Sequence, residues 1–182
     1  MLRHTGAVPM ETGRLILRGL VPADAGAVFA GWTGDPVVAE YMPWEPHRSE
    51  EETREWLRGV EKARAEVLMR YAWGIISKET GMPVGDISVN FEDDDEDHPG
   101  EVGYALSRAV WGRGYASEAL AGMTAFLKER VGARHLLGKV CKTNHASMAV
   151  LERAGFRYRE DGSYESFDGR RVFDSRVYWL DM

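Results

Sequence analysis

Two glycines, Gly112 and Gly114, stand between a short apolar run and a long amphipathic stretch. The apolar run, Val102 to Leu106, predicts a buried strand, and apolar residues recurring every three or four positions after Gly114 predict a helix. Glycine lets the main chain approach a ligand closely, and the first turn of a helix offers unpaired N–H groups and a partial positive charge. Arg113 adds a charged donor. The segment therefore predicts a phosphate-binding turn.

The turn departs from both common nucleotide-binding fingerprints. No Lys-Ser or Lys-Thr pair follows it, as a Walker A loop requires, and its glycine spacing is not that of the dinucleotide-binding G-x-G-x-x-G. A compact turn that uses glycine for structural reasons is the alternative that the turn alone leaves open. A second motif is needed to decide between them.

Residues 144–156 supply that second motif and read N-H-A-S-M-A-V-L-E-R-A-G-F. Together the two segments resemble the GNAT superfamily of acyl-CoA-dependent N-acyltransferases. The family's turn, (Q/R)-x-x-G-x-(G/A), is matched by Gly114 and Ala116. Its later motif, N-x-x-(A/S)-x-x-(L/V)-x-x-x-x-G-F, is matched by Asn144, Ser147, Val150, Gly155 and Phe156. Two motifs in this order are more specific than either alone, and the resemblance extends from about Arg14 to Trp179.

This resemblance implies one N-acetyltransferase domain over residues 1–182, of the α+β class, with a central, mixed, mostly antiparallel sheet flanked by helices. It implies acetyl-CoA as co-substrate and a primary amine as acceptor, which attacks directly in a ternary complex. The acceptor is either a protein N-terminal amine or a small-molecule amine. The implied cofactor-binding residues are Leu106, Ser107, Trp111, Gly112, Arg113, Gly114, Tyr115, Ala116 and Asn144.

Trp111 departs from the family pattern, which usually has Gln or Arg at that position. An indole cannot make the same pyrophosphate contact. Cofactor binding is therefore expected to depend on main-chain N–H groups and on Arg113.

Amide formation from an acyl thioester requires a neutral amine, a polarised carbonyl and a proton for the leaving thiolate. Glu101 begins the predicted central strand and shares a face with Gly103 and Ala105. Some GNAT enzymes place their general base at the corresponding position, so we predict that Glu101 is catalytic. An exposed charge at the strand end, and Asp86 acting through a bound water as the base, are the alternatives.

Many GNAT enzymes protonate the thiolate with a Tyr seven residues after the motif's Asn, but this chain has Leu151 there. Ser147 stands where the RimJ/RimL-like branch, which acetylates ribosomal-protein N-termini, carries Ser. We therefore predict that the Ser147 hydroxyl contacts the sulfur as a second catalytic group. A helix serine bonded to a main-chain carbonyl is the alternative. Asn144 is expected to cap its helix and to bond the pantetheine arm.

Composition limits the class of protein. A chain of 182 residues is long enough for one domain with a sizeable core, and its net charge of −6 argues against non-specific nucleic-acid binding. The single cysteine, Cys141, excludes an internal disulfide framework and fits a reducing compartment. No apolar run approaches the ~20 residues that span a membrane, and the N-terminal stretch lacks the apolar core of a signal peptide. We expect a cytoplasmic protein without a nucleic-acid or membrane partner.

The rest of the chain predicts strands and helices in mixed order. The expected strands are Arg14–Arg18, Tyr71–Ser77, Val84–Phe91, His135–Cys141, Phe156–Glu160 and Arg171–Leu180. The expected helices begin at Pro22, at Asp35, at the capping box from Ser49 with an apolar stripe that includes Val67 and Leu68, and at Asn144. The strand Arg171–Leu180 is expected to be an edge strand that could pair across a homodimer. Trp32, Tyr41 and Trp44 are candidates for closing over the acceptor, with Trp32 equally suited to the core.

Six consecutive carboxylates occupy residues 92–97. They lack the spacing and the glycine of a calcium loop, and the histidines form no zinc pattern, so we expect no metal site. A solvated, mobile loop is the interpretation that we favour over a metal loop. Attraction of a cationic acceptor by the field of the loop is a further role that this interpretation leaves open. The alternative function for the whole chain is a non-catalytic acyl-CoA sensor, against which the presence of both Glu101 and Ser147 argues.

Overall fold

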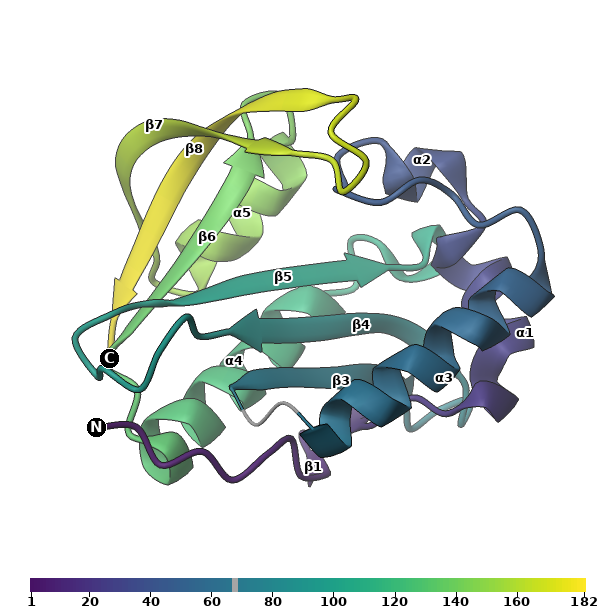
Figure 1. Ribbon diagram of the computed structural model, residues 1–182, viewed down its shortest axis with the longest axis horizontal. Helices are drawn as coiled ribbons and strands as arrows, with labels where there is room; N and C mark the ends of the chain where they lie inside the picture. Colours follow the sequence, from purple (N-terminus) through teal and green to yellow (C-terminus); the bar gives the residue numbers. More distant parts are fainter. Residues whose placement is uncertain (67–68) are drawn as a thin grey trace.

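An eight-stranded sheet forms the centre of the molecule, with strand order β1-β2-β3-β4-β5-β6-β8-β7 (Figure 1). The computed structural model describes residues 1–66 and 69–182. The strands are β1 (Met10–Glu11), β2 (Leu15–Arg18), β3 (Arg70–Ser77), β4 (Pro83–Asn90), β5 (Gly100–Leu106), β6 (His135–Cys141), β7 (Arg157–Glu165) and β8 (Val172–Asp181). Neighbouring strands are antiparallel except β5 and β6, which are parallel. This confirms the predicted α+β fold with a mixed, mostly antiparallel sheet.

Helices cover both faces of the sheet (Figure 1). The helices are α1 (Ala25–Val28), α2 (Pro36–Ala39), α3 (Glu50–Glu66), α4 (Tyr115–Phe126) and α5 (His145–Arg153). Short helical turns adjoin them: η1 (Pro22–Asp24), η2 (Phe29–Thr33), η3 (Arg108–Val110) and η4 (Leu127–Val131). We call the face that carries α4 and α5 the back face, and the face that carries α1, α2 and α3 the front face. Val67 and Leu68, expected to continue the stripe of α3, lie outside the described residues.

Each face has its own apolar core. On the back face, Leu120, Met123 and Leu127 are fully buried against the sheet, which explains the helical spacing of apolar residues after Gly114. On the front face, a smaller cluster gathers around Trp32 and Leu57, both fully buried. Burial of a large apolar side chain contributes roughly 1.5–3 kcal/mol, so these two layers hold the helices against the sheet.

The central opening of the sheet lies between β5 and β6. These strands pair only at their beginnings, where Gly100 lies opposite Leu136 and Glu101 opposite Leu137. Beyond Glu101 the two strands separate, as Figure 1 shows. β5 remains paired with β4 along six registers and β6 with β8 along seven, so each strand is held by its other neighbour while the two diverge.

The prediction that Arg171–Leu180 forms an edge strand is wrong. The structure places β8 between β6 and β7, so that both of its edges are paired. The two strands at the ends of the sheet are β1 and β7. The β7–β8 hairpin folds back on itself, and this puts the first strand of the hairpin on the outside.

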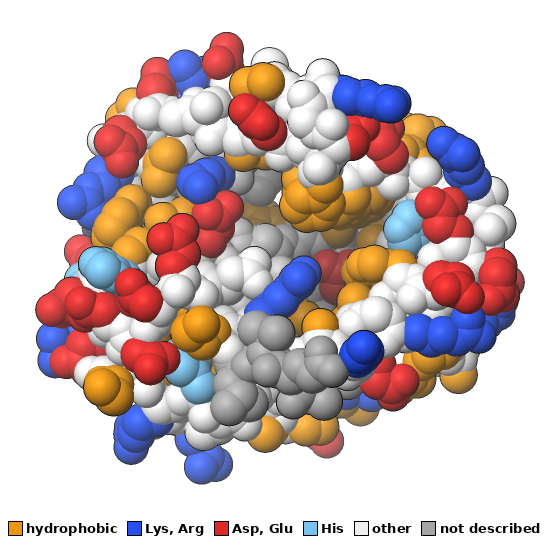
Figure 2. All heavy atoms as spheres, viewed as in Figure 1, with side chains coloured by type: hydrophobic (Ala, Val, Ile, Leu, Met, Phe, Trp, Pro, Cys, Tyr) orange, Lys and Arg blue, Asp and Glu red, His pale blue; other side chains and the backbone are white. Residues whose placement is uncertain are grey.

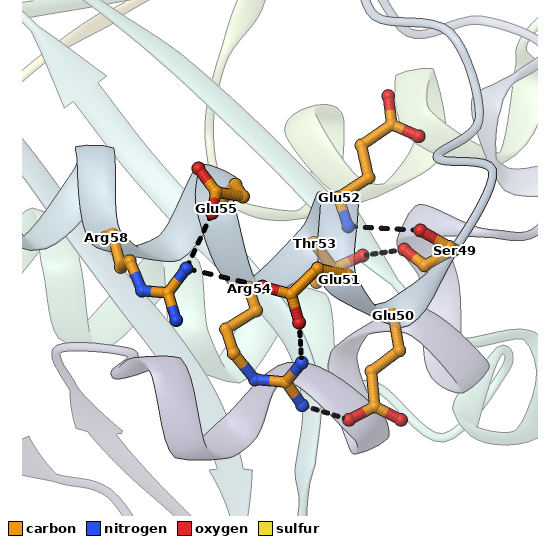
Figure 3. Close-up of polar contacts among 8 residues, drawn as sticks. All are labelled: Ser49, Glu50, Glu51, Glu52, Thr53, Arg54, Glu55 and Arg58. Atoms are coloured by element: carbon orange, nitrogen blue, oxygen red, sulfur yellow. Dashed lines mark hydrogen bonds and ion pairs between the residues drawn. The ribbon is translucent and has the colours of Figure 1, made fainter.

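Helix α3 is fixed at its N-terminal end by the predicted capping residues (Figure 3). The Ser49 hydroxyl accepts a hydrogen bond from the main-chain N–H of Glu52 at 3.2 Å, as a cap does. The Glu52 carboxylate accepts from the N–H of Arg48, one residue before the position that a capping box uses. Exposed ion pairs join successive turns of the helix: Arg54 with Glu50 and Glu51, and Arg58 with Glu51 and Glu55.

The acidic segment is more strongly paired than we expected. Glu96 accepts from the N-terminal ammonium at 2.9 Å and forms an ion pair with Arg134. Asp93 bonds His98 at 2.8 Å, and the carboxylate of Asp93 raises the pKa of that imidazole. The segment therefore joins the N-terminus to Arg134, the residue before β6.

A substitution at Gly85 on β4 tests how closely β4 and β5 pack beside the opening. An added methyl group there would lie 2.4 Å from the carbonyl oxygen of Ala105, so Gly85→Ala must push the strands apart. We expect it to lower the free energy of unfolding by about 1–3 kcal/mol. In the matched control Gly103→Ala, the nearest atom is the Ser88 hydroxyl at 3.7 Å, and stability should be retained. Urea unfolding of both variants measures this, and a wild-type midpoint for Gly85→Ala would contradict the reasoning.

Candidate active site

The predicted phosphate-binding turn lies at the end of β5 and leads into α4. Gly112 and Gly114 have φ values of 74° and 76°, in the left-handed region where other residues are strained. Helix α4 then begins at Tyr115, and the N–H groups of its first turn have no partner within the helix. The structure therefore brings the predicted residues together as a glycine turn followed by a helix N-terminus.

Trp111 closes this turn instead of facing a ligand with its N–H group. Its indole N–H donates to the carbonyl oxygen of Leu106 at 2.8 Å, and the side chain is 52% exposed. The departure from the family pattern thus has a structural use, because it holds the turn against the end of β5.

Arg14 supports the turn and was not singled out from the sequence. Its guanidinium donates to the carbonyl oxygen of Arg113 at 2.8 Å, bonds Glu118 at 2.6 Å and lies 4.8 Å from the ring centre of Tyr115. Burial opposes ionisation of Glu118, but hydrogen bonds from Thr12 and Arg14 lower the pKa of its carboxyl below the usual value. No motif spacing signals this contact, because Arg14 and Glu118 are 104 residues apart in the chain.

Ser147 lies on the back face and pairs with a tyrosine of β5. The side chain of Asn144 accepts from the N–H of Ser147 at 3.1 Å, which confirms the predicted cap of α5. The Ser147 hydroxyl lies 2.8 Å from the hydroxyl of Tyr104. Burial raises the pKa of Tyr104 to about 12, so this phenol stays protonated at neutral pH. The sequence pattern did not indicate Tyr104 either, since only the packing of α5 against β5 brings the two hydroxyls together.

Glu101 and Asp86 both point to the front face. Glu101 lies opposite Asn90, and Asp86 lies opposite Ala105. Residues directly opposite share a face, so the two carboxylates are four positions apart along β4, or about 13 Å. Glu101 is 45% exposed and bonds the ammonium of Lys139 at 2.8 Å, across the beginning of the opening.

Asp86 has a different environment from that of Glu101. Its Oδ2 accepts a hydrogen bond from the indole N–H of the buried Trp32 at 2.7 Å. Burial raises the pKa of Asp86 to about 6, against the lowering effects of this hydrogen bond and of the charge on Arg70. The carboxylate keeps some accessible surface because it lines a cavity of about 330 Å³ between α3 and the sheet. Figure 2 shows the front face hollowed in its centre, with hydrophobic side chains around the hollow.

Part of the front face is closed by the β7–β8 hairpin. The Arg171 guanidinium donates to the carbonyl oxygens of Met42 and Trp44, each at 3.1 Å. The Tyr164 hydroxyl donates to the carbonyl oxygen of Tyr41 at 2.7 Å. The segment after α2, which includes two of the aromatic residues expected to close over an acceptor, is therefore fastened to the hairpin.

The arrangement has a clear chemical consequence. The glycine turn and the hydroxyl pair of Ser147 and Tyr104 belong to the back face, whereas Asp86 and Glu101 belong to the front face. The opening between β5 and β6 connects the two. A molecule anchored by phosphate at the turn can extend along the free edge of β5 and present its far end to a second molecule on the front face.

Within residues 1–66 and 69–182, no three His, Cys, Asp or Glu side chains are grouped so that they could hold a metal ion. No helix in the same part of the chain is long and apolar enough to cross a membrane.

Comparison with known proteins identifies a family whose sequence pattern matches most of the chain. Residues 14–157 match the acetyltransferase (GNAT) domain. The chain is 29% identical over 166 residues to the uncharacterized N-acetyltransferase p20 of Bacillus licheniformis, covering 90% of each protein.

Solved structures share the fold. A putative ribosomal-protein-serine acetyltransferase from Vibrio cholerae superposes with a TM-score of 0.84 at 19% identity, over 98% of this chain and 99% of the other. RimL, a ribosomal L7/L12 alpha-N-protein acetyltransferase in complex with coenzyme A, gives a TM-score of 0.81 at 20% identity, over 96% and 98%.

The raised pKa of Asp86 predicts how the free energy of unfolding depends on pH. An aspartate has a pKa of about 3.9 when unfolded, so as the pH falls through 6 the folded protein takes up this proton first and is stabilised. At pH 8 the ionised carboxylate costs up to about 3 kcal/mol, and Asp86→Asn removes that cost. We therefore expect the variant to be more stable than the wild type at pH 8 and equal to it near pH 4, in urea unfolding.

Asp24 provides a control of opposite sign. Burial works against its ionisation, but the hydrogen bonds from Arg18 and from the N–H of Val21 lower its pKa. Asp24→Asn should therefore be destabilising at pH 8, with a deficit that vanishes at low pH. Loss of stability at pH 8 in Asp86→Asn as well would show that the Asp86 carboxylate is structural.

Proposed function

We propose a function from one premise: the chain belongs to the acetyltransferase (GNAT) domain family. It is therefore an acyltransferase. The proposal is that it moves the acetyl group of acetyl-CoA to a primary amine by direct attack in a ternary complex. The observation that carries this proposal is the opening between β5 and β6, with a phosphate-binding turn and a hydroxyl pair on one side and two carboxylates on the other.

Coenzyme A is proposed to bind along the back of the opening. Its pyrophosphate would contact the main-chain N–H groups between Gly112 and Ala116, with Arg113 as a charged partner. From Leu106 to Glu101 the free edge of β5 runs for about 17 Å, and it offers main-chain groups to the amides of an extended pantetheine arm. The thiol end would then lie near Ser147.

The proposed reaction forms one bond and breaks another. The amine nitrogen attacks the acetyl carbonyl carbon, the carbon–sulfur bond breaks, and the amine loses a proton to a carboxylate while the thiolate gains one. Ser147 is proposed to donate to the sulfur, and Tyr104 to support it through their hydrogen bond. The products are an amide and coenzyme A.

Two carboxylates are candidates for the base. Glu101 is the one that the family resemblance indicates, and it stands where the strands begin to part. Its carboxylate is 45% exposed and forms an ion pair with Lys139. Asp86 has a pKa of about 6, close to neutral pH, and lies one strand from the opening with only Gly103 and Ala105 between. We favour Asp86, since a base works best when its pKa is near the operating pH.

The experiment that tests the function is release of free thiol from acetyl-CoA in the presence of an amine panel. The panel should contain peptides with free N-termini, polyamines and amino acids. Thiol release above hydrolysis, with an acetylated amine detected by mass spectrometry, supports the proposal. Tight binding of coenzyme A without transfer to any amine would overturn it. A cytoplasmic location and a homodimer stay predictions.

The next prediction concerns the phosphate-binding turn. Gly114→Val places a branched side chain at a left-handed position beside the guanidinium of Arg14, so the turn must change shape. We expect at least a tenfold loss of coenzyme A affinity by calorimetry, as for loss of several hydrogen bonds. The matched control is Gly132→Val, also left-handed at φ 82° but at the opposite end of the same helical segment. It should cost similar stability and leave the affinity unchanged, and equal affinity in both variants would contradict the placement.

A pH–rate profile separates the catalytic roles. Asp86→Asn should lower kcat/KM about 10²–10⁴-fold near pH 7 and remove an inflection near pH 6, because the wild-type base must lose its proton. Higher pH should restore part of the rate, since more amine is then neutral. Ser147→Ala should cost less and should not respond to pH, because its loss affects the leaving thiolate.

Glu101→Gln is the decisive comparison. If Glu101 is the base, this variant shows the large pH-dependent loss and Asp86→Asn keeps the wild-type profile. All three variants should retain coenzyme A affinity, since none of these side chains is placed at the pyrophosphate.

A further inference from the structure

The cavity beside Asp86 has walls that suit an apolar group. Helix α3 contributes Trp56, Val60 and Ala63, and the sheet beneath contributes the small side chains of Ala72 and Ser88. At about 330 Å³, the cavity is near the lower limit for small-ligand sites. It therefore has room for one compact group.

Two opposite charges lie in this otherwise mainly apolar cavity. Of the lining residues that the structure describes, Asp86 is the one anion and Arg70 the one cation. Arg70 begins β3 opposite Asn90, four positions along from Gly74, which lies opposite Asp86. The two main-chain positions are roughly 13 Å apart along the strands, a span that the long Arg70 side chain and a bound small molecule cover together.

We infer that the acceptor is a free α-amino acid with an apolar side chain. Its amino group would contact Asp86 and Ser88, its carboxylate would contact Arg70, and its side chain would pack against Trp56 and Val60. This inference rests on the proposed function and identifies its substrate class. A polyamine would place positive charge against Arg70 and leave the apolar walls without a partner. A peptide N-terminus has an amide where Arg70 requires an anion.

The position of the amino group also fits the reaction. Ser88 lies opposite Gly103 on β5, so no side chain separates the cavity from the opening at that point. The amino acid arrives as an ammonium ion and loses one proton before attack and one during it. The nitrogen–carbon bond forms, the carbon–sulfur bond breaks, and the thiolate takes a proton. The products are an N-acetyl amino acid, coenzyme A and one released proton.

The first test compares three amines that share a side chain. L-Phenylalanine has a free carboxylate next to the amine, 2-phenylethylamine has none, and phenylalanylglycine has an amide there with its carboxylate one residue further away. We expect kcat/KM for L-phenylalanine to exceed the other two by about 10- to 100-fold, as for one charge-assisted contact. Arg70→Gln should remove that advantage by acting on L-phenylalanine alone, and Arg70→Lys should restore part of it.

The second test fills the cavity. Gly59 lines it, and an added Cβ there meets no atom within 4 Å, so Gly59→Leu extends into free space. We expect KM for L-phenylalanine to rise about tenfold or more while L-alanine is still acetylated. Coenzyme A affinity should not change, and Tm should not fall because leucine favours helix over glycine. Lys62→Leu, at an exposed position outside the lining of the cavity, is the matched control and should change none of these values.

The results separate this inference from the function on which it rests. If the peptide or 2-phenylethylamine is the better substrate, or if Arg70→Gln lowers kcat/KM equally for all three amines, the inference is wrong and the acetyltransferase assignment stands. If no amine is acetylated although coenzyme A binds, the proposed function itself fails.

Discussion

The incomplete pairing of β5 with β6 is the constraint on which the rest of the structure depends. Main-chain N–H and C=O groups inside a sheet need partners, and leaving one buried without a partner costs about 1–3 kcal/mol. Here two strands in the middle of the sheet share only two registers and then part. Their main-chain groups beyond that point are therefore left available to water or to a ligand.

Several parts of the fold prevent the opening from closing. On one side β4 holds β5 along six registers, and on the other β8 holds β6 along seven. The back face is supported by the apolar layer under α4 and α5. On the front, the bonds from Arg171 and Tyr164 fasten the β7–β8 hairpin to the segment after α2. The two halves of the sheet are thus held apart by contacts that lie outside the opening.

The sequence predicted what is local and missed what depends on distant contacts. The glycine turn, the helix that follows it and the Asn144 cap could all be predicted, because each depends on residues that are close together in the sequence. The edge position assigned to the last strand was wrong, since edge or interior depends on the pairing order of the whole sheet.

The site residues divide in the same way. Ser147 was found from its motif, but its partner Tyr104 comes from a strand 43 residues earlier in the chain. Asp86 was noted only as an alternative base. Its pKa is raised by burial and lowered by the hydrogen bond from Trp32, and neither of these tertiary effects can be inferred from spacing along the chain.

At Asp86 the requirements of the proposed reaction conflict with those of stability. A neutral asparagine in its place could keep the hydrogen bond from Trp32 without the cost of burying a charge, and the fold would gain from it. The indole N–H offsets part of that cost by bonding one carboxylate oxygen, yet the pKa of Asp86 still rises to about 6. A carboxylate held in this way is ionised at neutral pH but only weakly stabilised as an anion, and so it is ready to take a proton. The same burial that weakens the fold at high pH would suit the group to remove a proton from the amine in the reaction that we propose.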